Sequence, residues 1–127
     1  MQILVVEDSD SIARMIEALV QGRGHSVRTV ASGAQALDLA LEHQADVVLL
    51  DWSLDGNVSA ADFCARLRAE PATCEIPIVV LGEADEDAKS RALDAGVHAY
   101  YTKPFSPLAL LKELEGLRAR SSPRIKV

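Results

Sequence analysis

The chain has 127 residues, of which 49% are hydrophobic, and this is enough for one domain with a buried core. Its 19 acidic and 13 basic residues give a formal net charge of -6 with no run of Lys or Arg, which disfavours direct binding to nucleic acid. The longest apolar runs are much shorter than a membrane span or a signal-peptide core, so we expect a cytoplasmic protein that does not enter a membrane. Cys64 and Cys74 do not make a disulfide framework, and the histidines at positions 25, 43 and 98 share no metal-ligand spacing with them.

Five short apolar segments are expected to be β-strands. Ile3–Val6, Val47–Leu50 and Ile78–Leu81 lack polar alternation, which is typical of strands buried on both faces of a parallel sheet. Val27–Val30 and Ala99–Thr102 are more polar and are expected to be outer strands.

Apolar residues at helical spacing separate these strands. The residues that mark the helices are Ile12, Met15, Ile16, Leu19 and Val20, closed by Gly22 and Gly24; Ala36, Leu37, Ala40 and Leu41; Phe63, Cys64 and Leu67, preceded by a capping box of Ser59 and Asp62; Ala88, Ala92, Leu93 and Ala95, closed by Gly96; and Leu108, Leu111, Leu114 and Leu117 after Pro107. The alternation of strand and helix predicts an α/β domain with a doubly wound parallel sheet and helices on both faces. We expect one domain over residues 1–120, followed by a polar tail or the start of a linker over residues 121–127.

Charged side chains follow three of the predicted strands. Glu7 and Asp8 follow the first strand, Asp51 the third and Lys103 the fifth. In an open parallel sheet the ligand crevice lies outside the carboxyl ends of the strands, so three carboxylates and one ammonium are expected to converge there. Two like charges about 4 Å apart repel by roughly 4 kcal/mol at an effective dielectric near 20, and a divalent cation would offset that repulsion. We predict Mg²⁺ as the cofactor, because it prefers hard oxygen ligands.

The segments "VVED", "VVLLDWSLDG", "IPIVVL", "RALDAG" and "YYTKPFSP" occur in this order through the chain. In type and spacing they resemble the receiver domain of two-component response regulators, including the chemotaxis regulators. The resemblance implies a flavodoxin-like fold with five helices and five parallel strands in the order 2-1-3-4-5. It implies that Asp51 accepts a phosphoryl group and that Lys103 contacts that group. The implied Mg²⁺ ligands are Glu7, Asp8, Asp51 and the backbone carbonyl of Ser53.

The same resemblance implies further roles and partners. Tyr100 takes the position of an aromatic switch residue whose rotamer reports phosphorylation, and Pro104 is expected to follow a cis peptide bond. A histidine kinase or a phosphotransfer domain would donate the phosphoryl group. An output protein or domain would bind the face formed by the fourth helix, the fifth strand and the fifth helix, and a weak homodimer is left open. The chain is then a signalling module and not an enzyme, beyond self-phosphorylation from a phosphodonor and autodephosphorylation.

Two departures from the family pattern concern the switch. Receivers usually have Thr or Ser at the end of the fourth strand, where its hydroxyl bonds the phosphoryl group; here that position is Gly82 or Leu81, depending on the direction of counting. Neither has a hydroxyl, and Glu83 replaces the usual small residue, so we expect phosphorylation to shift Tyr100 only weakly. Asp55 stands where the family commonly has Pro, and is interpreted either as a loop substitution or as a fourth negative charge near the metal.

An alternative function is a pseudo-receiver, which keeps the fold as a constitutive protein-interaction module with little or no switching on phosphorylation. The complete set of carboxylates and lysine favours the phosphorylated receiver, whereas the missing hydroxyl favours the pseudo-receiver. An aspartyl-phosphate phosphatase would need a second Asp two residues after Asp51, where Ser53 stands. A flavodoxin would need a hydroxyl-rich loop after the first strand, where the chain has "EDSDS".

Overall fold

The computed structural model describes residues 1–42, 45–54 and 56–121, which form one sheet of five strands and five helices. The strands are β1 (Gln2–Val6), β2 (Ser26–Val30), β3 (Val47–Asp51), β4 (Ile78–Gly82) and β5 (Ala99–Thr102). Their order in the sheet is β2-β1-β3-β4-β5, and each neighbouring pair is parallel. The flavodoxin-like, doubly wound fold is therefore confirmed. His43, Asp55 and residues 122–127 of the expected tail lie outside the described residues.

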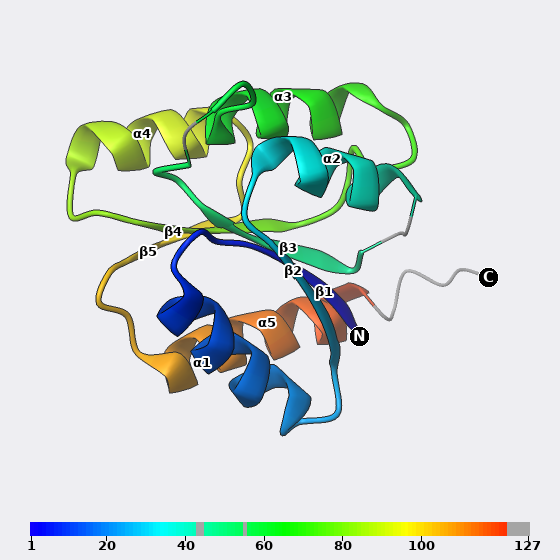
Figure 1. Ribbon diagram of the computed structural model, residues 1–127, viewed down its shortest axis with the longest axis vertical. Coiled ribbons are helices and arrows are strands. Elements are labelled where there is room, and N and C mark those ends of the chain that lie inside the picture. Colours follow the sequence, from blue (N-terminus) through cyan, green and yellow to red (C-terminus); the bar gives the residue numbers. More distant parts are fainter. Residues whose placement is uncertain (43–44, 55, 122–127) are drawn as a thin grey trace.

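The helices lie on both faces of the sheet. They are α1 (Asp10–Gln21), α2 (Gly33–Glu42), α3 (Ala60–Ala69), α4 (Glu86–Asp94) and α5 (Pro107–Ser121). Helices α1 and α5 cover one face, and α2, α3 and α4 cover the other (Figure 1). The ends of the helices follow the predicted signals, since Ser59 and Asp62 form a capping box at α3 and Gly96, with a φ of 90°, follows the end of α4.

Two apolar cores fill the space between the sheet and its helices, because successive strand residues point to opposite faces. The core under α2, α3 and α4 includes Leu4, Val6, Val48, Leu50, Ile78, Val80, Phe63, Cys64 and Leu67. The core under α1 and α5 includes Ile3, Val5, Val47, Leu49, Val79, Leu81, Ile16, Val20, Leu110 and Leu114. Strands β1, β3 and β4 are thus buried on both faces, while β2 and β5 are the more exposed outer strands, as predicted.

Two histidines connect α5 to the sheet, which the sequence pattern did not predict. His25 Nε2 lies 3.1 Å from Glu115 Oε2, and two nitrogens of Arg23 bind the same carboxylate. His98 Nε2 lies 3.1 Å from Glu113 Oε2. These contacts hold α5 against the loop before β2 and against the start of β5.

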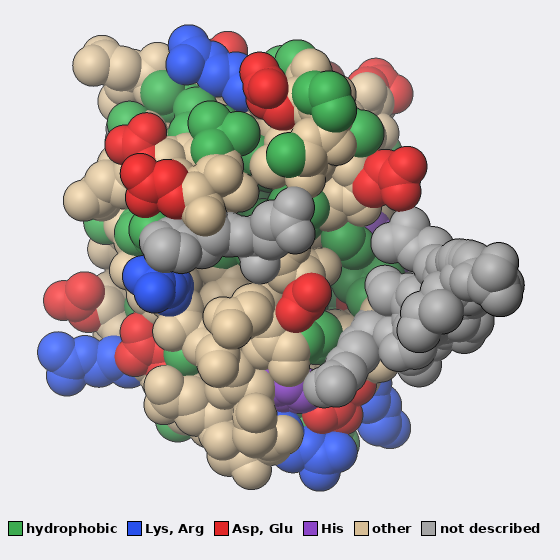
Figure 2. Space-filling view, turned by 90° about the vertical axis from the view of Figure 1, so that its right-hand side faces the viewer, with side chains coloured by type: hydrophobic (Ala, Val, Ile, Leu, Met, Phe, Trp, Pro, Cys, Tyr) green, Lys and Arg blue, Asp and Glu red, His purple; other side chains and the backbone are tan. Residues whose placement is uncertain are grey.

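Figure 2 shows the edge of the sheet where the strands begin, and acidic and basic side chains are interspersed in that view. Cys64 and Cys74, both within the described part of the chain, are free thiols. No helix in residues 1–42, 45–54 or 56–121 is long and apolar enough to span a membrane.

Candidate functional site

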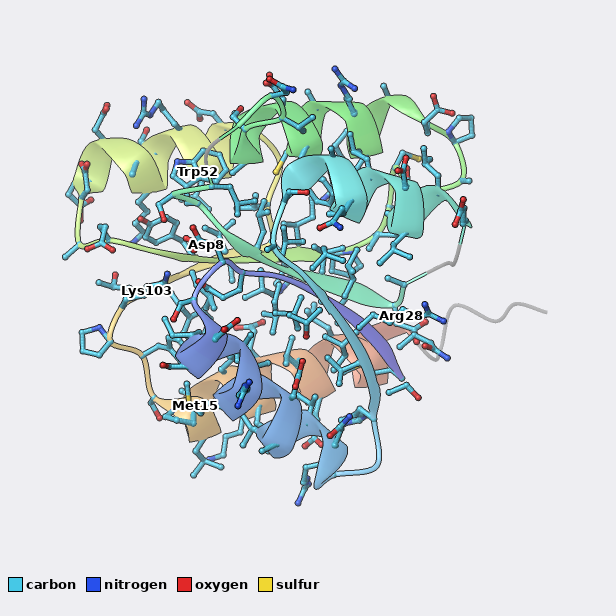
Figure 3. The ribbon with its side chains drawn as sticks, in the orientation of Figure 1. Asp8, Met15, Arg28, Trp52 and Lys103 are labelled. Atoms are coloured by element: carbon cyan, nitrogen blue, oxygen red, sulfur yellow. The ribbon has the colours of Figure 1, made fainter. Side chains whose placement is uncertain are left out.

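The carboxyl ends of three strands bring four charged side chains together. Glu7 and Asp8 follow β1, Asp51 is the last residue of β3, and Lys103 directly follows β5. Figure 3 shows Asp8, Trp52 and Lys103 at this edge of the sheet. The convergence expected from the strand ends is therefore present in the structure.

The three carboxylates lie close together and differ in exposure. One oxygen from each of Glu7, Asp8 and Asp51 lies within 4.8 Å of the other two. Glu7 is 3% exposed and Asp51 is 1% exposed, whereas Asp8 is open to solvent. Lys103 Nζ lies 3.3 Å from Asp51 Oδ1 and 3.5 Å from Glu7 Oε1. One ammonium therefore faces two buried carboxylates, and the site opens to water beside Asp8.

The two carboxylate oxygens of Asp51 have different surroundings. Oδ1 accepts a hydrogen bond of 3.0 Å from the backbone N–H of Ser53 and one of 2.8 Å from the Ser53 hydroxyl. Oδ2 is buried and, within the described part of the chain, accepts no hydrogen bond; the same holds for Glu7 Oε1. Glu7 Oε1 still lies 3.5 Å from Lys103 Nζ, as an ion pair. Buried polar atoms without a hydrogen bond are rare and costly, so these two oxygens are candidate ligand atoms.

The environment moves the pKa values of this group in different directions. Burial, followed by the charge of Asp51, raises the pKa of Glu7 to about 7. Burial also opposes ionisation of Asp51, but the hydrogen bonds from Ser53 and the charge of Lys103 outweigh it and lower the pKa of Asp51. Burial opposes the charged form of Lys103 as well, but the two carboxylates outweigh it and raise the pKa of Lys103. At neutral pH Asp51 is anionic, Lys103 is cationic and Glu7 is near its midpoint.

The donor set fits a hard divalent cation. Mg²⁺ binds carboxylate and carbonyl oxygens and keeps several waters, which suits two buried carboxylates and an exposed one. The oxygens of Glu7 and Asp51 that accept no hydrogen bond would become ligands of the cation, and the repulsion between the carboxylates would fall. Within residues 1–42, 45–54 and 56–121, Glu7, Asp8 and Asp51 are the one group of three His, Cys, Asp or Glu side chains close enough to share an ion.

Gly82 is the residue at the end of β4 that faces Tyr100. The side chain of Leu81 packs into the core under α1 and α5, so residue 82 points to the opposite face of the strand. Tyr100 packs against the core on that face, and its hydroxyl donates a hydrogen bond of 2.7 Å to the backbone carbonyl of Glu83. Of the two residues that the sequence left open, Gly82 is therefore the one on the side of β4 that Tyr100 occupies.

Two interactions were not predicted from the sequence. Ser53 was expected to contribute a backbone carbonyl, but its hydroxyl also bonds Asp51. A signal existed for the bond from the Ser53 backbone, because Asp side chains commonly accept a hydrogen bond from the backbone N–H two positions on. The bond from Tyr100 to Glu83 had no such signal, since it depends on how β5 lies beside β4. The peptide bond between Lys103 and Pro104 is cis in the structure.

Comparisons with known proteins agree with this architecture. The chain matches the response regulator receiver domain family over residues 3–115. It is 34% identical over 122 residues to the phosphate regulon transcriptional regulatory protein PhoB of Pseudomonas aeruginosa, which covers 95% of this chain and 53% of that protein. It is 32% identical over 120 residues to the response regulator ArlR of Staphylococcus aureus, which covers 94% of this chain and 53% of that protein. The chain therefore spans about half the length of these curated relatives.

Solved structures of similar sequence have the same fold. The chemotaxis response regulator CheY4 of Vibrio cholerae matches with a TM-score of 0.83 at 30% identity, covering 91% of this chain and 97% of that chain. The receiver domain of the Francisella response regulator 1452 matches with a TM-score of 0.86 at 26% identity, covering 95% of this chain and 98% of that chain. Since sequence, strand order and the family match over residues 3–115 agree, the chain belongs to the response regulator receiver domain family of two-component signalling systems.

Proposed function

We propose that this chain is a phosphorelay receiver that accepts a phosphoryl group on Asp51 in a Mg²⁺-dependent reaction. The observation that supports this most is the pair of buried carboxylates, Glu7 and Asp51, which lie beside Lys103 and each have one oxygen that accepts no hydrogen bond within the described residues. Two buried carboxylates that share one ammonium lower the stability of the fold. Binding of a cation and a phosphoryl group is a functional reason for keeping them there.

The proposed chemistry needs a nucleophilic oxygen and charge neutralisation. An oxygen of Asp51 forms a bond to the phosphorus of a phosphohistidine donor, while the P–N bond breaks and its electron pair stays on the imidazole nitrogen. The transition state spreads negative charge over the phosphoryl oxygens, and Lys103, 3.3 Å from Asp51, is placed to neutralise part of it. Mg²⁺, when held by Glu7, Asp8, Asp51 and the Ser53 carbonyl, would supply further neutralisation.

Ser53 is proposed to orient the nucleophile. Its N–H and its hydroxyl both bond Asp51 Oδ1, so the rotation of the carboxylate is restricted and Oδ2 is left for the metal or for phosphorus. A fixed near-attack geometry lowers the barrier of a transfer reaction, because less freedom is lost on reaching the transition state.

The proposed partners follow from the family. Receiver domains act between histidine kinases or phosphotransfer domains and an output, and we place the output contact of this chain on α4, β5 and α5. Because the chain spans about half the length of PhoB and ArlR, a downstream domain or a separate protein would both serve as the output. We place the protein in the cytoplasm, where histidine kinases present their phosphorylated domains.

A pseudo-receiver is the second candidate function, and Gly82 is the observation that favours it. The position that would present a hydroxyl to the phosphoryl group has no side chain. In this alternative the chain binds its partner constitutively, and phosphorylation of Asp51 is absent or without effect. The two candidates differ in whether a phosphoryl group on Asp51 changes the binding of a partner, and a chain that cannot be phosphorylated fits only the pseudo-receiver.

Incubation with acetyl phosphate and Mg²⁺, followed by intact mass measurement, tests the proposal. The wild type is expected to gain one phosphoryl group, and Asp51→Asn and the wild type in EDTA are expected to gain none. Asp38→Asn, which changes an exposed acidic residue of α2, is the matched control and should be modified like the wild type. A wild type that stays unmodified, by acetyl phosphate or by a phosphorylated kinase, would support the pseudo-receiver.

A further inference from the structure

The ring of Tyr100 occupies the space that a side chain at position 82 would fill. β4 and β5 are paired here, with Val80 opposite Tyr100 and Gly82 opposite Thr102. A Cβ atom added to Gly82 would clash with Tyr100 Oη, and would lie 2.7 Å from Cζ and 3.0 Å from Cε2 of the same ring. Cβ atoms do not approach other heavy atoms this closely, so this placement of Tyr100 requires glycine at position 82.

Two further contacts hold the ring in place. The Tyr100 hydroxyl donates a hydrogen bond of 2.7 Å to the backbone carbonyl of Glu83, the first residue after β4. The ring itself is half-buried and packs against the apolar core under α2, α3 and α4. Tyr100 therefore connects β5 to the loop that precedes α4.

We propose that Gly82 and Tyr100 form a fixed wedge, which keeps the face of α4, β5 and α5 in one conformation whether or not Asp51 carries a phosphoryl group. This inference rests on the proposed function for its phosphorylated state. A ligand shifts a conformational equilibrium only by interacting differently with two states. Residue 82 has no side chain that would contact the phosphoryl group, and Tyr100 already fills the space beside it. The phosphoryl group therefore makes no contact at residue 82 that would favour a second position of the Tyr100 ring.

The wedge predicts which partners can distinguish the phosphorylated from the unphosphorylated protein. A partner that binds the α4, β5 and α5 face would bind with equal affinity in both states. Only a partner that contacts the site itself, beside Asp8 and Lys103, would distinguish them.

The two tyrosines of the chain allow the wedge to be observed directly. Tyr100 and Tyr101 are the only tyrosines, so ¹³C labelling of tyrosine rings gives NMR signals from two residues, which Tyr101→Phe assigns. The amide of Ser53, which donates to Asp51, reports whether the site is filled. Beryllium fluoride with Mg²⁺ is the phosphoryl mimic. We expect the Ser53 amide to shift while the Tyr100 ring signals stay within their linewidth. A Tyr100 signal that moves together with the Ser53 amide would overturn the inference.

Gly82→Val and Gly82→Thr test the wedge in the resting protein. Both add a Cβ and are expected to displace the ring, which shifts the Tyr100 signals without any metal or mimic. The fold should tolerate the change because the clash is with the end of one side chain. Thr also adds the hydroxyl that Val lacks, so the mimic is expected to move Tyr100 in Gly82→Thr and not in Gly82→Val.

The failures of the two proposals are distinguishable. Tyr100 signals that are the same in Gly82→Val and in the wild type would overturn the wedge, even if the Ser53 amide responds to the mimic. A Ser53 amide that does not respond would instead count against the proposed site at Asp51, while the Gly82→Val comparison would still decide the wedge.

Discussion

Glu7 and Asp51 are neighbouring buried carboxylates whose surroundings separate their pKa values. Burial and the charge of Asp51 favour the protonated form of Glu7, whereas the bonds from Ser53 and the charge of Lys103 keep Asp51 ionised. Such a separation is common where one carboxylate must react as an anion and a second must exchange a proton or a cation. A cation that binds at neutral pH would release the proton of Glu7.

The metal-free protein should lose stability as the pH rises from 4.5 to about 7, because the folded state of Glu7 has a pKa of about 7 and the unfolded state the ordinary 4.5. The full effect of this one group is about 3 kcal/mol. The lowered pKa of Asp51 affects stability only below pH 3.8, the ordinary pKa of the group, and therefore outside this pH range. In urea unfolding with EDTA, the free energy of unfolding of Glu7→Gln relative to that of the wild type is expected to rise through this pH range. If the free energies of unfolding of the wild type and of Glu7→Gln change in parallel with pH, the raised pKa of Glu7 is contradicted.

At the scale of elements, the strand ends were predictable and the contact between β4 and β5 was not. Glu7, Asp51 and Lys103 follow apolar runs, and parallel strands present their carboxyl ends at one edge, so their convergence follows from order along the chain. The position of Tyr100 depends on its rotamer and on the absence of a Cβ at Gly82, and neither follows from periodicity. The sequence also did not distinguish Gly82 from Leu81, because counting forward from Pro77 gives Gly82 and counting back from Gly96 gives Leu81.

The start of α4 depends on one side chain in the loop after β4. Asp85 is the N-cap residue, and its Oδ1 accepts hydrogen bonds of 2.9 Å from Asp87 N–H and 3.4 Å from Ala88 N–H. Asp85→Ala is expected to lower the free energy of unfolding by about 1 kcal/mol, whereas Asp85→Asn should keep most of it, since Asn also caps helices. Urea midpoints measure both. Equal losses in the two variants would show that the charge matters and the cap does not.

At the scale of the whole molecule, the site joins the ends of β1, β3 and β5, so a ligand held there would stabilise the sheet rather than one loop. Lys103 already bridges Asp51 and Glu7 across these strands. A ligand that binds only the folded state raises its stability by mass action. The effect should therefore be visible in global unfolding.

Mg²⁺ at about 100 times its dissociation constant should add about 2.7 kcal/mol to the free energy of unfolding. The thermal midpoint of the wild type is expected to rise with Mg²⁺, while that of Asp51→Asn should rise much less. Asp38→Asn again provides the control for a general effect of lost charge, and should respond like the wild type. A midpoint that does not change in saturating Mg²⁺ would rule out the metal site.

The identity of the phosphorylated residue is tested most directly by chemical mapping of the acyl phosphate. The protein is treated with acetyl phosphate and Mg²⁺, reduced with borohydride, which converts a phosphorylated aspartate to homoserine, and digested for peptide sequencing by mass spectrometry. Homoserine is expected at position 51, with unmodified aspartate at Asp8 and no conversion when EDTA replaces Mg²⁺. Homoserine at another aspartate, or conversion of Asp51 at the same rate in EDTA, would contradict a Mg²⁺-dependent phosphoacceptor at Asp51.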